Sequence, residues 1–376
     1  MPEVIFITRE LSHYRVPFHE TVRNLLSANK VNYRLIYSEP SPREAAKKDT
    51  AKIDWAEEVK TFYFGAEAEL CWQRVLGHVR HSDLIVIGQE NKLLSNYPLY
   101  LRRALGGPRL AFFGHGKNFQ AANPNSFSER FKRLLVNKVD WWFAYTERSA
   151  DIVAQSGFPR DRITVFNNSI DTSSIRMELA SIDPVEENAS RQLLLSGSHK
   201  VGVYVGGLYP LKRIAFMLEA AKRVRELISD FHLLVIGAGE DTGMVVAAAE
   251  EHEWIHYVGP KFGREKTLLT SLGRVFLMPG LVGLGILDSF AYGTPMVTTD
   301  VSFHSPEIEY LKDGTNGVIV KDCNNVGAYA EAVARILHDD TWREHLRTGA
   351  AEALHTYTIE KMAERFATGV LGALTV

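Results

Sequence analysis

Two cations stand between a glycine-containing loop and a predicted helix in the second half of the chain. Residues 201–205 have the apolar pattern of a short buried strand, Gly206 and Gly207 follow it, and Lys212 and Arg213 precede a helical pattern. Cations at the start of a helix oppose its dipole, so this pair is locally unfavourable unless an anion lies between the cations and the loop amides. A diphosphate is an anion of this kind. An exposed basic pair on a surface loop is the alternative interpretation.

A second glycine turn follows the apolar run 275–278 and leads into another predicted helix. The turn consists of Gly283, Leu284 and Gly285. A strand, a glycine turn and a helix N-terminus in succession offer free backbone N–H groups to an anion. The same pattern also occurs in tight βα turns that bind nothing, because such turns need glycine in any case.

Polar residues also follow predicted strands in the first half of the chain. His115 lies between two glycines after the strand 110–114, where its imidazole could donate a hydrogen bond to a ligand or accept one. A structural or merely exposed histidine is the alternative. Further candidates, for an acceptor-binding surface, are Arg9, His13, Tyr14, Arg15, Glu90 and Asn91. For the residues near position 13, capping of the first helix is the alternative interpretation.

Two familiar motifs are set aside. Residues 252–256 match H-E-x-x-H, but a zinc site needs both histidines on one helix face, and this run passes from a helix end into a strand. Residues 237–243 are glycine-rich, but the third glycine comes one position too late for a dinucleotide fingerprint. Cys71 and Cys323 are too few for a thiolate metal site. We therefore predict neither a metal site nor a bound cofactor.

The elements that must position these residues are strands alternating with helices. Predicted strands lie at 4–8, 31–37, 84–88, 110–114, 139–145, 163–166, 201–205, 233–236, 255–258, 275–278 and 296–299. Such alternation is typical of βαβ units with a parallel sheet. The chain is therefore expected to be an α/β protein with two doubly wound domains. Ligands of such sheets bind beyond the carboxyl ends of the strands, so the site is expected in a cleft between the domains.

A polar stretch without sustained periodicity marks the expected domain boundary. We predict an N-terminal domain over 1–170, a linker over 171–200 and a C-terminal domain over 201–355. Residues 356–376 are expected to form a helix that packs back on the N-terminal domain.

Composition restricts the class of protein. Among 376 residues, 45% are hydrophobic and 23% charged, with a formal net charge of −2, so nucleic acid is not an expected partner. The chain shows neither a signal peptide nor an apolar run long enough for a membrane span, which predicts a cytoplasmic protein. Residues 127–139 combine apolar and basic side chains, as in a helix resting on the inner membrane face. The solvated face of a core helix is the alternative.

Several segments, taken together, resemble the motifs of glycosyltransferase family 4. In the second half these are VGGLYPLKR, VIGAGED, YVGP, MPGLVGLGILDSFAYGTPMV and HSPEIEYLKDGTNGVIV, and in the first half GHGKNFQ, AYTERSADIVAQSGFP and ITVFNNSID. That family consists of retaining, nucleotide-sugar-dependent enzymes with the GT-B fold. The resemblance therefore implies two Rossmann-like domains, with donor nucleotide binding in the C-terminal one and acceptor binding in the N-terminal one.

The resemblance also implies roles for individual residues. Lys212, with Arg213 beside it, resembles the lysine that contacts the donor diphosphate, and His115 resembles the histidine that faces the transferring sugar. Asp288 stands where the family has the second of two glutamates, which is associated with the ribose. The donor-binding positions on the glycine loops and the nucleoside side are Gly206, Gly207, Gly237, Gly239, Val258, Gly259, Gly283, Leu284 and Gly285.

The chain departs from the family pattern in this same region. The first glutamate of the pair, eight residues before Asp288, is replaced by Gly280, and the glycine loop is about two residues shorter. The arginine common in the diphosphate loop is replaced by Gly207. These departures concern the groups that face the donor, so they bear on donor identity.

The function that the resemblance implies is transfer of a hexosyl group from a nucleotide diphosphate sugar to an acceptor hydroxyl, with retention and without a metal ion. The acceptor is expected to be a glycan or a lipid-linked glycan. The alternatives are a nucleotide-sugar epimerase or a phosphorylase on the same fold, or a non-catalytic protein that binds nucleotide.

Overall fold

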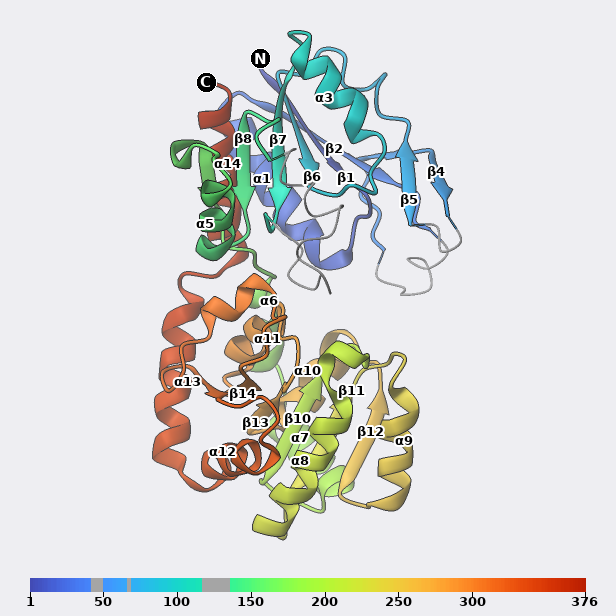
Figure 1. The fold of residues 1–376 in the computed structure, drawn as a ribbon. Coiled ribbons are helices and arrows are strands. Elements are labelled where there is room, and N and C mark those ends of the chain that lie inside the picture. Colours follow the sequence, from blue (N-terminus) through green and yellow to red (C-terminus); the bar gives the residue numbers. More distant parts are fainter. Residues whose placement is uncertain (42–49, 66–68, 117–135) are drawn as a thin grey trace. The chain divides into compact units, whose positions relative to one another are not determined.

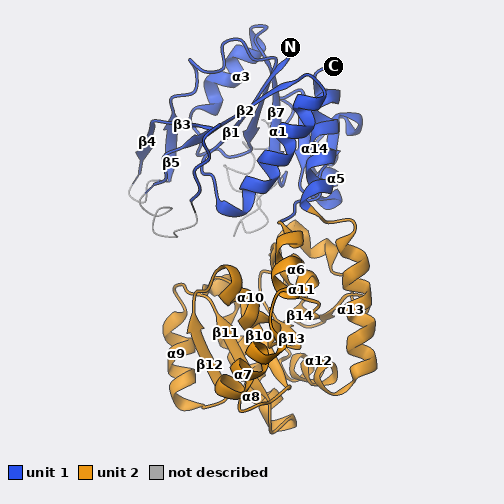
Figure 2. Ribbon diagram, turned by 180° about the vertical axis from the view of Figure 1, so that it is seen from behind, with its two compact units in different colours: residues 1–170, 359–376 blue, residues 171–358 orange. Residues whose placement is uncertain are grey.

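The computed structural model describes residues 1–41, 50–65, 69–116 and 136–376, which form two compact units (Figures 1 and 2). Unit 1 comprises Met1–Ile170 together with Ile359–Val376, and unit 2 comprises Asp171–Thr358. Each unit contains its own parallel sheet covered by helices, so the predicted α/β class is confirmed.

Within its described residues, unit 1 is built around seven parallel strands in the order β3-β2-β1-β6-β7-β8-β9. These strands are β1 (Glu3–Thr8), β2 (Asn32–Ser38), β3 (Glu57–Val59), β6 (Leu84–Gly88), β7 (Arg109–Gly114), β8 (Trp141–Ala144) and β9 (Ile163–Val165). A separate antiparallel pair is formed by β4 (Thr61–Phe64) and β5 (Leu70–Gln73). The helices are α1 (Val16–Ala28), α3 (Asn96–Ala104), α5 (Glu147–Gln155), α14 (Ile359–Ala373) and the 3-10 helices η1 (His13–Arg15) and η2 (Arg160–Arg162).

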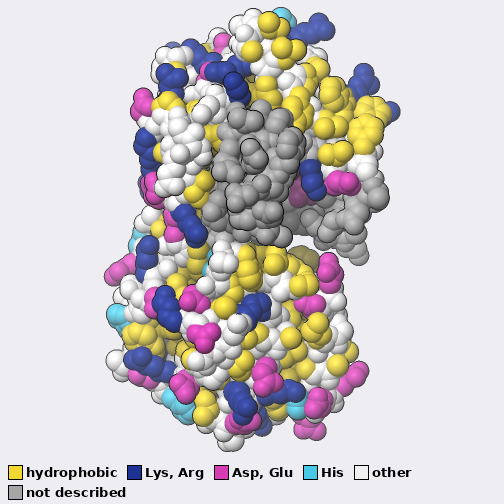
Figure 3. Space-filling model, in the orientation of Figure 1, with side chains coloured by type: hydrophobic (Ala, Val, Ile, Leu, Met, Phe, Trp, Pro, Cys, Tyr) yellow, Lys and Arg dark blue, Asp and Glu magenta, His cyan; other side chains and the backbone are white. Residues whose placement is uncertain are grey.

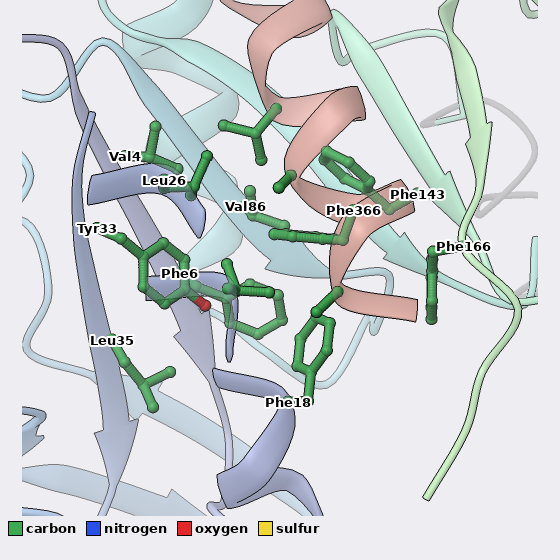
Figure 4. Close-up of a cluster of buried hydrophobic side chains, with 14 of the residues drawn as sticks. Val4, Phe6, Phe18, Leu26, Tyr33, Leu35, Val86, Phe143, Phe166 and Phe366 are labelled. Atoms are coloured by element: carbon green, nitrogen blue, oxygen red, sulfur yellow. The ribbon is translucent and has the colours of Figure 1, made fainter. Parts of the chain in front are cut away.

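The core of unit 1 lies on both faces of this sheet. Successive side chains of a strand point to opposite faces, so Val4 and Phe6 of β1 join one hydrophobic cluster while Ile5 and Ile7 join the other. The cluster around Phe6 includes Phe366 of α14, a residue from the far end of the chain (Figure 4). The C-terminal helix is thus an integral part of the core of unit 1.

Unit 2, which is described throughout, has six parallel strands in the order β12-β11-β10-β13-β14-β15. They are β10 (Val201–Val205), β11 (His232–Ile236), β12 (Ile255–Gly259), β13 (Val275–Leu277), β14 (Met296–Thr299) and β15 (Gly317–Val320). Its helices are α6 (Thr172–Ala180), α7 (Pro184–Leu195), α8 (Ile214–Leu227), α9 (Thr242–Glu251), α10 (Gly263–Ser271), α11 (Gly285–Tyr292), α12 (Val326–His338), α13 (Asp340–Leu354) and the 3-10 helices η3 (Pro210–Lys212) and η4 (Pro306–Tyr310). Counted from β10, this is the 3-2-1-4-5-6 order of a dinucleotide-type doubly wound sheet.

Residues 171–200, expected to be a linker, are instead the first two helices of unit 2. The side chains of Asp171 and Asp183 cap α6 and α7 by accepting backbone N–H groups, 2.9 Å from Ser174 N and 2.8 Å from Val185 N. In α6 and α7 only Thr172, Arg191 and Leu195 are buried, so no clear apolar face at helical spacing marks these helices in the sequence.

Among the described residues, no helix is long and apolar enough to cross a membrane. Of the segment 127–139, proposed above as a membrane-facing helix, residues 127–135 lie outside the described residues.

Candidate functional site

The two glycine loops singled out in the second half of the chain lie at one place in unit 2. The strand order reverses direction between β10 and β13, so the loop after β10 runs to α8 while the loop after β13 runs to α11. Ligands of open α/β sheets bind at the carboxyl ends of two such diverging strands. Gly206 and Gly207 follow β10, and Gly283 and Gly285 follow β13.

The glycines after β10, β11 and β12 hold three neighbouring loops together. The Gly206 N–H donates to Ile236 O at 3.0 Å, and the Gly237 N–H donates to Gly259 O at 3.0 Å. A Cβ at Gly237 would lie 1.8 Å from Gly206 O, so only glycine permits this approach of two backbones. These glycines therefore shape the wall of the site, whatever ligand it takes.

Lys212 is buried beside the turn that follows β13. Its Nζ donates to Leu281 O at 2.5 Å and lies 3.8 Å from Met278 Sδ. Burial lowers the pKa of Lys212 to about 8, although the Asp288 carboxylate raises it. A cation with few polar neighbours is costly to bury, and an anion next to it would offset that cost.

A second lysine, which the sequence analysis did not select, completes a charged cluster with Lys212. Lys266 on α10 donates from Nζ to Asp288 Oδ1 at 2.9 Å, and the two side chains are 26% and 17% exposed. Burial lowers the pKa of Lys266, but Asp288, Tyr292 and Glu178 together raise it above its usual value. The cluster therefore holds two ammonium groups and one carboxylate at the N-terminal end of α11. None of the donor-side positions selected from the sequence lies in α10, so Lys266 was not among them.

The turn 279–285 approaches the backbone around Lys212 closely. A Cβ at Gly280 would lie 2.2 Å from Leu211 O and 2.6 Å from Lys212 C. The position eight residues before Asp288 thus has no room for any side chain here. Glycine at position 280, noted in the sequence as a departure from the family pattern, is therefore required by the close packing of this turn.

His304 connects the same turn to β14 through two hydrogen bonds. The sequence analysis did not select this residue either. The Val282 N–H donates to His304 Nδ1 at 3.3 Å, so Nε2 carries the proton and donates to Thr299 O at 2.7 Å. The imidazole is 4% exposed. Both contacts are to backbone groups, so only the tertiary structure shows the role of this residue.

The guanidinium of Arg213 is occupied by contacts within unit 2. Arg213 has a left-handed backbone, with φ of 58°, and its guanidinium donates to Cys323 O at 2.5 Å, Asn324 Oδ1 at 2.9 Å and Thr299 Oγ1 at 3.3 Å. In this position Arg213 joins the loop after β15 to β14. Its contact with a phosphate stays a prediction.

Beyond the turn, α11 begins without a side-chain cap, and Gly283 has a φ of 57° with no atom closer than 3.9 Å to an added Cβ. Gly239 packs against Leu208 O, and Val258 and Gly259 end β12. All the predicted donor-binding positions of the second half therefore border the carboxyl end of this sheet.

Unit 1 has a pocket of about 370 Å³ at its own point of strand reversal, between β1 and β6. Of the predicted acceptor-side residues, Arg9, Tyr14, Arg15 and Glu90 line this pocket, whereas His13 is exposed and does not.

Aromatic rings lie around the guanidinium of Arg15, one of the arginines that line this pocket. The Arg15 guanidinium lies 5.0 Å from the ring centre of Tyr14, 5.7 Å from that of Tyr145 and 5.8 Å from that of Phe113. The His115 ring packs on the Tyr145 ring at 4.1 Å, which places His115 next to a residue that lines the pocket.

The H-E-x-x-H run does not share one helix face. Helix α9 ends at Glu251 and β12 begins at Ile255, and His256 Nε2 lies 2.8 Å from His232 Nδ1. Over the described parts of the chain, no group of three or more His, Cys, Asp or Glu residues is placed to hold a metal ion.

Part of unit 2 matches a family of known proteins. Residues 199–339 match the family described as glycosyl transferases group 1. The phosphatidyl-myo-inositol mannosyltransferase of Mycobacterium leprae is 27% identical over 197 residues, which cover 48% of this chain and 52% of that protein. The D-inositol 3-phosphate glycosyltransferase of Corynebacterium glutamicum is 24% identical over 249 residues, 62% and 58% of the two chains. The chain spans about half the length of the curated relatives it matches.

The fold of the whole chain also has solved counterparts. The crystal structure of Anabaena HepE in complex with UDP and glucose has a TM-score of 0.71 at 13% identity, covering 99% of this chain and 100% of that one. Sucrose-phosphate synthase from Thermosynechococcus elongatus has a TM-score of 0.72 at 14% identity, covering 99% of both. Residues 199–339 thus carry a domain of the glycosyl transferases group 1 family, in a chain whose two α/β units have the GT-B fold.

Proposed function

We propose that this protein is a glycosyltransferase that moves a hexosyl group from a nucleotide diphosphate sugar to an acceptor hydroxyl, with retention. The observation that carries the proposal is the cluster of Lys212, Lys266 and Asp288 beside the glycine loops of unit 2. A relative of the same fold was crystallised with UDP and glucose, which supports a nucleotide-sugar donor. Retention is supported by the resemblance to family 4.

The chemical task is to stabilise the diphosphate that leaves the sugar. Its negative charge grows in the transition state, and fixed donors aimed at such charge are typically worth about 3 kcal/mol each. Lys212 is suited to this task because it is buried, so its interaction with an anion is little screened. Backbone N–H groups at the start of α11 and in the glycine turn would add uncharged donors. In this proposal protein cations neutralise the diphosphate without a metal ion.

Asp288 would accept hydrogen bonds from the ribose hydroxyls, while the hydrogen bond from Lys266 holds its carboxylate in position. The loops after β11 and β12, with Gly237 and Gly259, would border the nucleoside. His115, in unit 1, would position the donor sugar or stabilise charge near it.

The acceptor would bind in the unit 1 pocket lined by Arg9, Arg15 and Glu90. The two curated relatives named above act, by their names, on acceptors that carry a phosphate on an inositol ring. Arginines together with aromatic rings suit an acceptor with an anionic group and an apolar ring face. A phosphorylated polyol or a lipid-linked glycan fits that description.

The test replaces Lys212 by methionine, which keeps the apolar stem and removes the charge. A thermal-shift screen over nucleotide sugars first identifies the donor, since a ligand that binds the native state stabilises it. With that donor, we expect Lys212→Met to lower the transfer rate by about 10²–10³-fold. The exposed Lys312 provides the matched control, and Lys312→Met should leave the rate unchanged. A wild-type rate in Lys212→Met would refute the assignment.

The stereochemistry is tested separately. A proton NMR spectrum of the product should show the same anomeric configuration as the donor sugar. An inverted product would refute retention, whereas the proposed donor site would still stand.

A further inference from the structure

A second cluster of cations lies in unit 2, at the opposite end of the sheet from the glycine loops. A pocket of about 340 Å³ opens there, bordered by residues that immediately precede β10, β13 and β14 and by the end of α11. In a parallel sheet the N-terminal ends of the strands meet at one edge and the carboxyl ends at the other. The pocket is therefore a different site from the proposed donor site. Its lining, in this fully described unit, includes Arg191, Arg274, Arg343 and Arg347.

Three of these arginines have close carboxylate partners. Arg191 pairs with Glu187 at 2.9 Å. Arg343 pairs with Asp340 at 2.5 Å, and Arg347 pairs with Glu344 at 2.9 Å. One carboxylate per guanidinium is enough to compensate these three charges. The fourth arginine of the pocket differs from them.

Arg274 has no such partner. Its guanidinium makes no hydrogen bond to any described residue, and its nearest carboxylate, Asp340, is 3.7 Å away and already bonded to Arg343. The side chain is only 33% exposed. Partial burial of a guanidinium that lacks a hydrogen-bond acceptor is unfavourable, and those of its N–H groups that still reach solvent can donate to a ligand.

The surroundings of Arg274 increase this cost. Burial, followed by the nearby guanidinium of Arg343, lowers the pKa of Arg274, although Asp340 raises it. Burial also lowers the pKa of His199, which lines the same pocket, and the charges of Arg191 and Arg274 add to that effect. Both shifts have the sign expected where positive charge is in excess.

The helices that bring these residues together are well separated in the sequence. Arg191 comes from α7, and Arg343 and Arg347 come from α13, whose neighbours include α11 (Figure 2). Arg347 lies against Gly293 at the end of α11, with its Nε 3.4 Å from an added Cβ. On the face of unit 2 seen in Figure 3, acidic and basic side chains are interspersed. That face therefore carries no broad positive field.

We propose that the pocket lined by Arg191, Arg274, Arg343 and Arg347 is a binding site for a phosphate-bearing small molecule, with Arg274 as its main ligand. Guanidinium groups present paired N–H donors that match phosphate oxygens. The volume of about 340 Å³ leaves room for an organic group next to the phosphate. The proposed donor site plays no part in this argument, so either site can be present without the other.

The test measures binding of inorganic phosphate and of glycerol phosphate to the full chain by isothermal titration calorimetry at constant ionic strength. The Lys212→Met variant serves as the background, because phosphate could also enter the donor site. We expect both ligands to bind, and tighter binding of glycerol phosphate would identify a phosphomonoester as the occupant.

Two substitutions in that background locate the site. Arg274→Gln should weaken binding by about tenfold or more, as expected when a charged hydrogen-bonding group is lost. Arg347→Gln should weaken it to a smaller extent, and because Arg347 is half exposed this variant should fold normally. Arg223, exposed on α8 and paired with Glu226, provides the control, and Arg223→Gln should bind as before.

The proposal is overturned if neither ligand binds the Lys212→Met protein. It is also overturned if binding persists unchanged in both Arg274→Gln and Arg347→Gln, since the anion would then bind elsewhere. Circular dichroism of each variant confirms that weaker binding does not arise from unfolding.

Discussion

Lys266 on α10 donates a 2.9 Å hydrogen bond to the carboxylate of Asp288 in the first turn of α11. The pair joins two helices that follow different strands of the unit 2 sheet. A carboxylate in the first turn of a helix is also favoured by the helix dipole. The Asp288 carboxylate is therefore held in place before any ligand arrives.

Replacing Lys266 by methionine is expected to impair both stability and nucleotide binding. The Asp288 carboxylate would lose its partner while remaining only 17% exposed, and we expect a loss of about 1–2 kcal/mol in the free energy of unfolding. Urea denaturation measures the loss, and calorimetry with UDP measures the affinity. In Lys361→Met, which removes an exposed pair with Glu364 in unit 1, both quantities should stay near the wild-type values.

A double-mutant cycle of Lys266→Met with Asp288→Asn measures the interaction energy between these two residues, apart from their other contacts. If Lys266 acts through Asp288, the stability losses should be clearly non-additive, because the second substitution removes an interaction already lost. Additive losses would show that Lys266 acts independently of Asp288.

The affinity of the free protein for a nucleoside diphosphate should fall as pH rises through about 8. Burial lowers the pKa of Lys212 to about 8, so the ammonium form that attracts the diphosphate is depleted above that pH. Below pH 8 the group is charged in the free protein, and affinity should depend little on pH. Calorimetry at pH 9 in two buffers of different ionisation enthalpy should reveal proton uptake on binding. An affinity that is flat from pH 7 to pH 9 would contradict this role of Lys212.

The same pKa predicts the sign of a stability effect. The folded-state value is below that of an unfolded lysine, so the folded protein binds the proton less tightly. Folding is therefore disfavoured by this group at pH below about 8, and the penalty disappears as pH rises toward the unfolded value. Lys212→Met should remove that pH dependence, as measured by urea denaturation between pH 7 and pH 10.

Placing a glutamate eight residues before Asp288, by Gly280→Glu, should destabilise the protein and should not improve activity. A Cβ at this position would lie 2.2 Å from Leu211 O, so the turn or the backbone at Lys212 must shift. Overpacking of this kind costs about 1–3 kcal/mol, and Gly280→Ala should show most of it. Gly243→Ala is the matched control, because no atom lies within 4 Å of its added Cβ and alanine favours the helix there. Thermal unfolding of Gly280→Glu, Gly280→Ala and Gly243→Ala measures the loss of stability in each.

His304→Ala should loosen the turn 279–285. The buried Val282 N–H and Thr299 O would both lose their partner, at a cost of about 1–3 kcal/mol for each unsatisfied group. Hydrogen exchange at Val282 should accelerate more than exchange in β10, which lies outside the turn. Donor affinity should fall as well, because the turn borders the proposed diphosphate site. Unchanged exchange at Val282 would show that other contacts hold the turn.

Much of the fold could be predicted from residue patterns. The predicted strand 201–205 coincides with β10, and the helical pattern predicted after Arg213 coincides with α8. Both are apolar runs with clear periodicity, bounded by glycine or by a change of pattern. Helices α6 and α7 were missed because they bury few residues, and β3 was missed because three residues carry no periodicity.

The candidate site was predictable only in part. Lys212 could be found because it follows a strand and a glycine loop in the chain, which are local features. Lys266 and His304 could not be found in this way, because each acts through a residue more than 20 positions away in the sequence. The partner of Lys266 is Asp288, and that of His304 is Val282. No residue type or spacing near either of them indicates those contacts.

The sequence by itself determined the α/β class, the glycine loops after β10 and β13, and the resemblance to family 4. These depend on hydrophobic periodicity and on short motifs, which act over a few residues. Only the tertiary structure decided that Gly280 has no room for a glutamate, that Arg213 is engaged by the loop at Asn324, and that Arg274 is left without a close partner. The physical reason is that steric exclusion and charge compensation depend on atoms that folding brings together from distant parts of the chain.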